Sequence, residues 1–245
     1  MSNNRILILD YGSQYTQLIA RRVRELKVYS EIHPCTWPLE QIEAFAPQGI
    51  ILSGGPSSVL DPFAPPLDPE LLRMGVPVLG ICYGMQAISH FGGGSVEKAT
   101  HREYGYAHVD MAEAHPLFAG IDEKPFQVWM SHGDRVKHLP PGFRVIASSD
   151  HCPCAAMSNK TNTLVGLQFH PEVTHTQQGK KIISNFIFDM CGCEATWTMS
   201  SFIETQIQLI RDKVGADNVI LGLSGGVDSS VAAVLIHRAI GDQLT

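Results

Sequence analysis

The chain has 245 residues, of which 44% are hydrophobic and 17% charged, an ordinary globular composition with enough apolar material for a sizeable core. Its formal net charge of −6 gives no reason to expect a nucleic-acid or anionic-membrane partner. The sequence has neither a signal peptide nor an apolar run long enough to cross a bilayer, so we expect a cytoplasmic protein.

Short apolar runs alternate with helical segments over the first 90 residues. The runs at 5–10, 28–33, 49–52 and 76–80 predict strands. An apolar face over 18–26 predicts a helix after the first run, and a second helix-like stretch reaches His90. This alternation predicts parallel pairing in a doubly wound sheet. Ligands bind at the carboxyl ends of such strands, so the loops at 11–13, 53–56 and 81–84 should share one edge.

The pattern changes after Gly94. Strand-like runs at 104–111, 126–131, 143–148 and 163–169 have few helical segments between them, which predicts an antiparallel addition to the mostly parallel sheet. A helix over 176–190 is expected to close this first α/β domain, at 1–193. Residues 194–200 are expected to form a linker.

A second α/β domain is expected to start at 201–245. Ser200 or Ser201 can cap a helix that runs to about Val214. A strand at 218–223, a loop and a helix at 229–240 should follow. One strand and one helix cannot make a sheet, because both edges of the strand lack partners. The segment is therefore expected to be the truncated start of that domain.

A nucleophile is predicted at Cys82. Gly80-Ile81-Cys82-Tyr83-Gly84 has the form G-x-C-x-G between an apolar strand and a helix. Such a turn projects its middle side chain into a cleft, and the helix N-terminus favours a thiolate. A buried structural cysteine is the plainer alternative. The backbone N–H of Tyr83 would point to a developing oxyanion.

His170 and Glu172 are the predicted partners of this thiol. Pro171 favours an extended His170, so the side chains at 170 and 172 should face the same way. Glu172 could then orient the imidazole while its other nitrogen faces Cys82. A polar pair at a strand end is the alternative. Ser53-Gly54-Gly55-Pro56 could form the opposite wall, with the N–H of Gly55 as second oxyanion donor.

Together, S-G-G-P, G-x-C-x-G and H-P-E resemble the class I glutamine amidotransferase family over residues 5 to 190. The resemblance implies hydrolysis of glutamine through a thioester on Cys82, with His170 as base and acid and Glu172 as orienter. It also implies a glutamine-binding role for Gln86 and for residues of the S-H-G-D segment, Ser131, Gly133 and Asp134.

A second motif follows the predicted strand at 218–223. It resembles the S-G-G-x-D-S loop of ATP pyrophosphatases, and it presents backbone N–H groups and a helix N-terminus to phosphate. A glycine-rich turn is the alternative. The resemblance implies that ATP is bound by Ser224, Gly225, Gly226, Val227, Asp228, Ser229 and Ser230.

A triad glutaminase followed by this loop resembles the family of glutamine-hydrolysing GMP synthases, as do the stretches at 101–106 and 129–134. That resemblance implies glutamine, xanthosine monophosphate and ATP with Mg²⁺ as substrates, a homodimer, and no prosthetic group. Carbamoyl-phosphate, CTP and anthranilate amidotransferases share the triad but lack the loop. NAD synthetases share the loop but use another type of glutaminase. Two further hypotheses are a Cys-His peptidase and a regulatory, non-catalytic subunit.

The remaining cysteines are expected to be thiols, as is usual in a cytoplasmic chain. Cys152/Cys154 and Cys191/Cys193 form two C-x-C pairs, which could suggest a four-thiolate zinc site. Structural zinc pairs usually have two to four intervening residues, whereas these pairs have one. We therefore expect no metal site in the chain.

Overall fold

The computed structural model describes residues 4–245, with the side chains of 100–102 excepted. Residues 1–3 of the expected first domain, and the side chains of His101 and Arg102 in the 101–106 stretch, lie outside the described part. The chain divides into two compact units, one reaching Thr196 and the other covering Trp197–Thr245.

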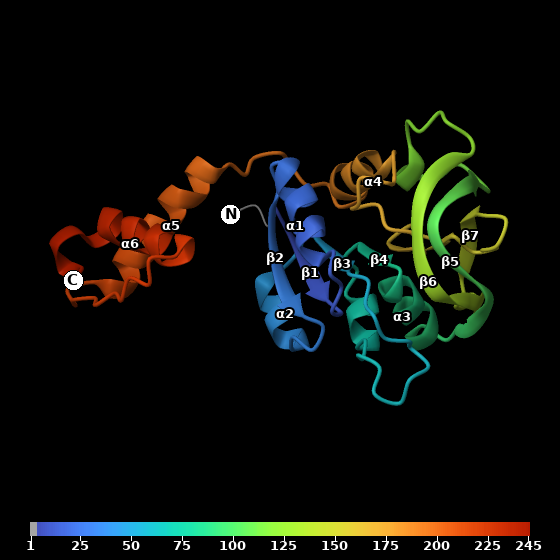
Figure 1. Ribbon diagram of the computed structural model, residues 1–245, viewed down its shortest axis with the longest axis horizontal. Coiled ribbons are helices and arrows are strands. Elements are labelled where there is room, and N and C mark those ends of the chain that lie inside the picture. The colour runs from blue at the N-terminus through green and yellow to red at the C-terminus, as the bar shows by residue number, and fades with distance from the viewer. Residues whose placement is uncertain (1–3) are drawn as a thin grey trace. The chain divides into compact units, whose positions relative to one another are not determined.

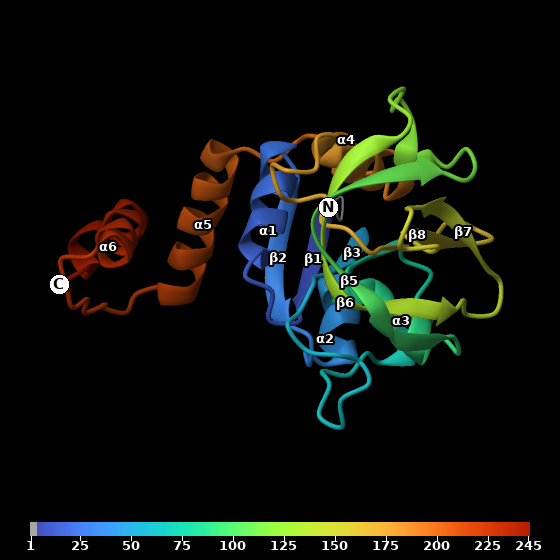
Figure 2. The same ribbon diagram turned by 45° about the vertical axis from the view of Figure 1, so that its right-hand side comes forward.

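The first unit is built on one mixed sheet, whose strands follow the order β2-β1-β3-β4-β9-β8-β7-β5-β6 within the described residues. The parallel part holds β1 (Arg5–Asp10), β2 (Tyr29–Pro34), β3 (Gly49–Leu52), β4 (Val78–Ile81) and β9 (Leu164–Leu167). The antiparallel part holds β5 (Ser95–Met111), β6 (Phe126–His138), β7 (Phe143–Ser148) and β8 (Ala156–Asn159), and Figure 2 shows it beside the parallel strands. The predicted α/β sheet with an antiparallel addition is confirmed.

Helices cover both faces of the parallel strands (Figure 1). The helices α1 (Thr16–Glu25) and α4 (Gly179–Asn185) pack on one face, and α2 (Leu39–Phe45) and α3 (Tyr83–Phe91) on the other. The strand sequences explain this arrangement, because alternate residues of β1 enter opposite cores: Ile6 and Ile8 join one, Leu7 and Leu9 the other. All four side chains are almost completely buried.

Several elements differ from the sequence prediction. Helix α2 and strand β8 were not predicted; each is short, and α2 has one fully buried side chain, Ile42, so its periodicity is weak. The expected helix at 176–190 consists of α4 followed by a π-helical turn, Phe186–Met190.

In the second unit, helices α5 (Met199–Val214) and α6 (Val227–Ile240) agree with the predicted helices. Thr198, rather than Ser200 or Ser201, caps α5, and it forms a capping box with Ser201. The predicted strand at 218–223 is wrong. Val219 makes only an isolated bridge with Leu244, because this segment has a single short extended neighbour to pair with.

The close contact of α3 with β3 depends on Gly84. A Cβ at this position would lie 2.5 Å from the carbonyl oxygen of Leu52. We predict that Gly84→Ala lowers the free energy of unfolding by about 2–3 kcal/mol, because backbone must shift to admit the methyl group. Gly142→Ala is the control, since Gly142 has a positive φ of 83° but open space around it. The control should cost only about 1 kcal/mol. Urea unfolding of both variants measures the difference, and equal losses would contradict the packing argument.

Candidate active site

Cys82 occupies a strained turn between β4 and α3. Its φ of 52° and ψ of −104° are unusual for a residue with a side chain, and the thiol is almost buried, at 6% exposed. The backbone N–H of Cys82 donates to the carbonyl of Leu167 at 2.7 Å, which ties the turn to β9. Strain of this kind persists only where the surroundings determine it, and it is concentrated at functional sites.

His170 and Glu172 lie directly after β9, where the sequence predicted them. The Nδ1 of His170 is 2.7 Å from Oε1 of Glu172, and both side chains are buried. Because a carboxylate accepts, Nδ1 carries a proton, and the other ring nitrogen is free for the hydrogen bond with Cys82. The predicted order of thiol, imidazole and carboxylate is therefore present in space.

This arrangement raises the pKa of His170 well above its ordinary value. Burial acts against the charged ring, but the carboxylate of Glu172 and the sulfur of Cys82 outweigh it.

The loops at the carboxyl ends of the strands meet around Cys82, as predicted. A Cβ built on Gly54 would lie 3.1 Å from Cε1 of His170 and 3.7 Å from Cβ of Cys82. The N–H of Tyr11 donates to Oγ of Ser53 at 2.9 Å, which joins the first loop to the second. This edge holds a cavity of about 580 Å³, and its lining includes six residues predicted from the sequence: Gly55, Cys82, Gln86, Ser131, Gly133 and Asp134.

The cavity carries charges of both signs. Asp61 and Asp134 contribute carboxylates, and Lys98 contributes an ammonium group. The carboxylate of Asp134 accepts a hydrogen bond from Oγ of Ser58. A ligand with a cationic and an anionic end, such as an amino acid, would find partners for both.

Tyr83 is the first residue of α3, so its backbone N–H has no acceptor within the helix. It lies next to the nucleophile, and Gly55 faces the same cavity from the loop after β3. The backbone of Gly55 thus lines the cavity, and that of Tyr83 adjoins the nucleophile.

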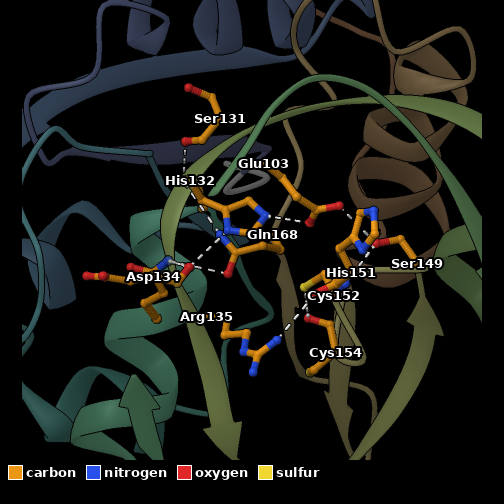
Figure 3. Close-up of polar contacts among 12 residues, drawn as sticks. Glu103, Ser131, His132, Asp134, Arg135, Ser149, His151, Cys152, Cys154 and Gln168 are labelled. Carbon is orange, nitrogen blue, oxygen red and sulfur yellow. Dashed lines mark hydrogen bonds and ion pairs between the residues drawn. The ribbon is translucent and has the colours of Figure 1, made fainter. Parts of the chain in front are cut away.

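Sequence reasoning missed a polar cluster that includes His132 of the cavity lining (Figure 3). Glu103 on β5 pairs across the sheet with His132 on β6, whose Nε2 is 3.1 Å from Oε2 of Glu103. Glu103, His132 and Cys152 form a group, within the described residues, whose possible ligand atoms lie close enough together to hold a metal ion. Both strand segments were noted in the sequence, but only the strand register places Glu103 opposite His132.

The thiols of the two C-x-C pairs are packed into the protein. Burial raises the pKa of Cys152 and of Cys154 to about 12, and that of Cys193 to about 11. It also raises the pKa of Cys191 well above its usual value. These side chains are therefore neutral thiols at neutral pH.

The predicted phosphate loop lies at the start of α6 in the second unit. Gly226 is the N-cap residue of that helix, and Gly225 has a positive φ of 81°. Ser224 and Ser229 join their hydroxyls at 3.0 Å across the loop, and Oγ of Ser230 donates to the carbonyl of Gly226 at 2.9 Å. The first N–H groups of the helix have no acceptor within it, and the residues of this turn from Ser224 to Asp228 are exposed.

Comparison with known proteins agrees with this geometry. The family profile "Glutamine amidotransferase class-I" matches residues 7–190, and the profile "NAD synthase" matches residues 198–245. The chain belongs to the class-I glutamine amidotransferase family. No helix in the described part of the chain is long and apolar enough to cross a membrane.

The relatives it matches include "GMP synthase [glutamine-hydrolyzing]" from Thermomicrobium roseum, 58% identical over 100% of this chain and 46% of the relative. The protein of the same name from Ectopseudomonas mendocina is 55% identical over 99% of this chain and 47% of its own. The chain thus spans about half the length of these curated relatives.

Solved structures show the same fold. A Thermoplasma acidophilum protein described as a GMP synthase subunit is 31% identical, with a TM-score of 0.65 over 82% of this chain and 96% of its own. A Thermotoga maritima glutamine amidotransferase has a TM-score of 0.58 over 99% of this chain and 100% of its own, and at 19% identity it supports the fold alone.

The raised pKa of His170 predicts a pH-dependent contribution of Glu172 to stability. A histidine whose pKa is higher in the folded than in the unfolded protein stabilises the fold fully at pH values below its unfolded pKa. This stabilisation is lost as the pH rises through its folded pKa. Glu172→Gln keeps the shape of the side chain but removes the charge. We predict that wild type exceeds this variant in stability most near pH 6. The difference should shrink towards high pH, with a slope of at most about 1.4 kcal/mol per pH unit. Urea unfolding at several pH values tests this, and a difference that does not vary with pH would contradict it.

Proposed function

We propose that the unit reaching Thr196 hydrolyses glutamine to glutamate and ammonia. Cys82 is the nucleophile, His170 the base and acid, and Glu172 the residue that orients the imidazole. The observation that carries this proposal is the buried bond of 2.7 Å between His170 and Glu172, with Cys82 at the other ring nitrogen.

The reaction proceeds in two steps. The sulfur attacks the side-chain amide carbon of glutamine, and the N–H groups of Gly55 and Tyr83 stabilise the oxyanion that forms. His170, which has taken the proton of the thiol, gives that proton to the amide nitrogen; the carbon–nitrogen bond then breaks, ammonia departs, and a thioester remains. A water molecule that His170 deprotonates attacks the thioester, glutamate is released, and the thiol is restored.

The amino-acid end of glutamine binds in the cavity beside Cys82. The carboxylate of Asp134 takes the α-ammonium group, and Ser131, Gly133 and Gln86 line the path of the side chain. Lys98 is the cation that faces the α-carboxylate. The opposite charges present in one cavity support this assignment.

For the whole protein, of which this chain spans part, we propose synthesis of GMP from xanthosine monophosphate, ATP and glutamine. The names of the relatives and the profile match at 198–245 support this. The loop from Ser224 to Ser230 takes the phosphates of ATP together with Mg²⁺, and no prosthetic group takes part.

The proposed domains are residues 1–193 and 201–245, joined by a linker at 194–200. The proposed enzyme is a cytoplasmic homodimer.

Replacement of the nucleophile tests the glutaminase directly. We predict that Cys82→Ala releases glutamate at least about a thousandfold more slowly than wild type, because the covalent step is lost. Cys154→Ala is the matched control, since it removes another buried thiol, which packs in the other of the two cores. Glutamate release and circular dichroism are measured on all three proteins. Activity of Cys82→Ala within tenfold of wild type would rule out this nucleophile.

The phosphate loop can be tested by added bulk. Around a Cβ on Gly226 the nearest other atom is Oγ of Ser224 at 3.5 Å, so the fold itself has room for a larger residue. We predict that Gly226→Val weakens the binding of magnesium pyrophosphate, because its side chain occupies the space that phosphate needs. Phosphorus NMR of pyrophosphate titrated with protein measures this, with Gly222→Val as control. Equal binding by both variants would mean that the loop is only a turn.

A further inference from the structure

We propose that Gln168 is a further catalytic residue, whose side-chain amide donates a hydrogen bond to the sulfur of Cys82 and stabilises the thiolate. This inference rests on the proposed glutaminase function. It concerns a side chain that the triad leaves out, although it contacts the reacting atom.

Gln168 reaches the sulfur from the same strand end as His170. Gln168 is the first residue after β9, in the bend that leads to His170. The Nε2 of Gln168 lies 3.7 Å from Sγ of Cys82, within reach for a sulfur acceptor, and the side chain is fully buried. The backbone N–H of Gln168 donates to the carbonyl of Ala155 at 2.9 Å, which fixes the backbone of Gln168 just beyond the strand.

The direction of this amide follows from its neighbour, Gln86. The Nε2 of Gln86 lies 2.9 Å from the carbonyl oxygen of Asp134 and 3.3 Å from Oε1 of Gln168. A carbonyl can only accept, so Gln86 must present its NH₂ group to Asp134. Its second hydrogen then requires an oxygen from Gln168, and the NH₂ group of Gln168 is left facing the sulfur. Turning either amide over would oppose two donors or two acceptors.

Glu103 and His132 form the far end of this hydrogen-bond network, as Figure 3 shows. The Nδ1 of His132 is 3.0 Å from the same carbonyl of Asp134, to which it must donate. The Nε2 of His132 faces Oε2 of Glu103. Because a carboxylate oxygen accepts, one proton must lie between the ring and the carboxylate. Hydrogen bonds therefore link Glu103 to Cys82 through His132, the carbonyl of Asp134, Gln86 and Gln168. Glu103 and His132 are positioning residues for the amide of Gln168.

The bond favours the ionised sulfur over the thiol. As a thiol, Cys82 donates to the carbonyl of Ser131 at 3.6 Å and is a weak acceptor. As a thiolate, it accepts from Gln168 a charge-assisted bond, which is about twice as strong as a neutral one. Gln168 is fully buried, and a charge-assisted bond is stronger in such surroundings than in water.

Alkylation of Cys82 by iodoacetamide tests this without requiring turnover, with mass spectrometry to follow the Cys82 peptide. We expect Gln168→Leu to react about tenfold more slowly at neutral pH, the loss of one hydrogen bond to a charged group. At high pH, where the thiolate forms in any case, its rate should equal that of wild type. Gln168→Glu keeps an acceptor for Gln86 but places a carboxylate oxygen at the sulfur, so its profile should move further towards high pH. Gln127→Leu, a half-buried glutamine on β6, is the control.

The outcomes separate this inference from the proposed function. Shifted profiles with no glutamate release by wild type would support the hydrogen bond from Gln168 to the sulfur but remove the glutaminase assignment. Glutamate release by wild type, with both Gln168 variants alkylated like wild type at every pH, would overturn the inference alone. Circular dichroism confirms folding, and Gln168→Glu carries the test if the leucine variant is unstable.

Discussion

The backbone of Cys82 is the constraint on which the rest of the site depends. A left-handed residue between β4 and α3 is costly, and it is held there by backbone contacts that exclude side chains at the flanking glycines. A Cβ on Gly80 would lie 2.6 Å from the backbone of Gly84. The sheet therefore sets the direction of the sulfur, and the sulfur meets the end of β9 because β4 and β9 are neighbouring parallel strands.

The antiparallel strands supply the wall that the parallel sheet lacks. Strand β6 carries Ser131 to Asp134 to the cavity, and its pairing with β5 places Glu103 behind that wall. The carbonyl of Asp134 accepts from Gln86, which bonds the wall to α3, and the contact of His132 with Glu103 joins the wall to β5. Polar groups buried in this way are stable only when each has a partner, and here each partner also restricts the geometry around the sulfur.

The sequence was sufficient for features that depend on neighbours along the chain. The turn at Cys82, the pair at His170 and Glu172, and most strands of the parallel sheet follow from local spacing and hydrophobic pattern. Features that depend on register could not be predicted. Strands β5 and β6 shift their register between Lys98 and Glu103, so neither strand alone could place Glu103 opposite His132. The bonds of Gln86 to Gln168 also join distant positions. The strand expected at 218–223 failed because a strand needs partners that local sequence cannot supply.

The central claim is that one cysteine among six is the nucleophile because the fold places it beside His170. A glutamine analogue with an electrophilic carbon in place of the amide would label that residue, and peptide mapping by mass spectrometry would locate the adduct. The account predicts one adduct per chain, on Cys82, prevented by excess glutamine, with the thiols at 152, 154, 191 and 193 unlabelled. An adduct on one of those thiols, or labelling that glutamine does not prevent, would contradict it.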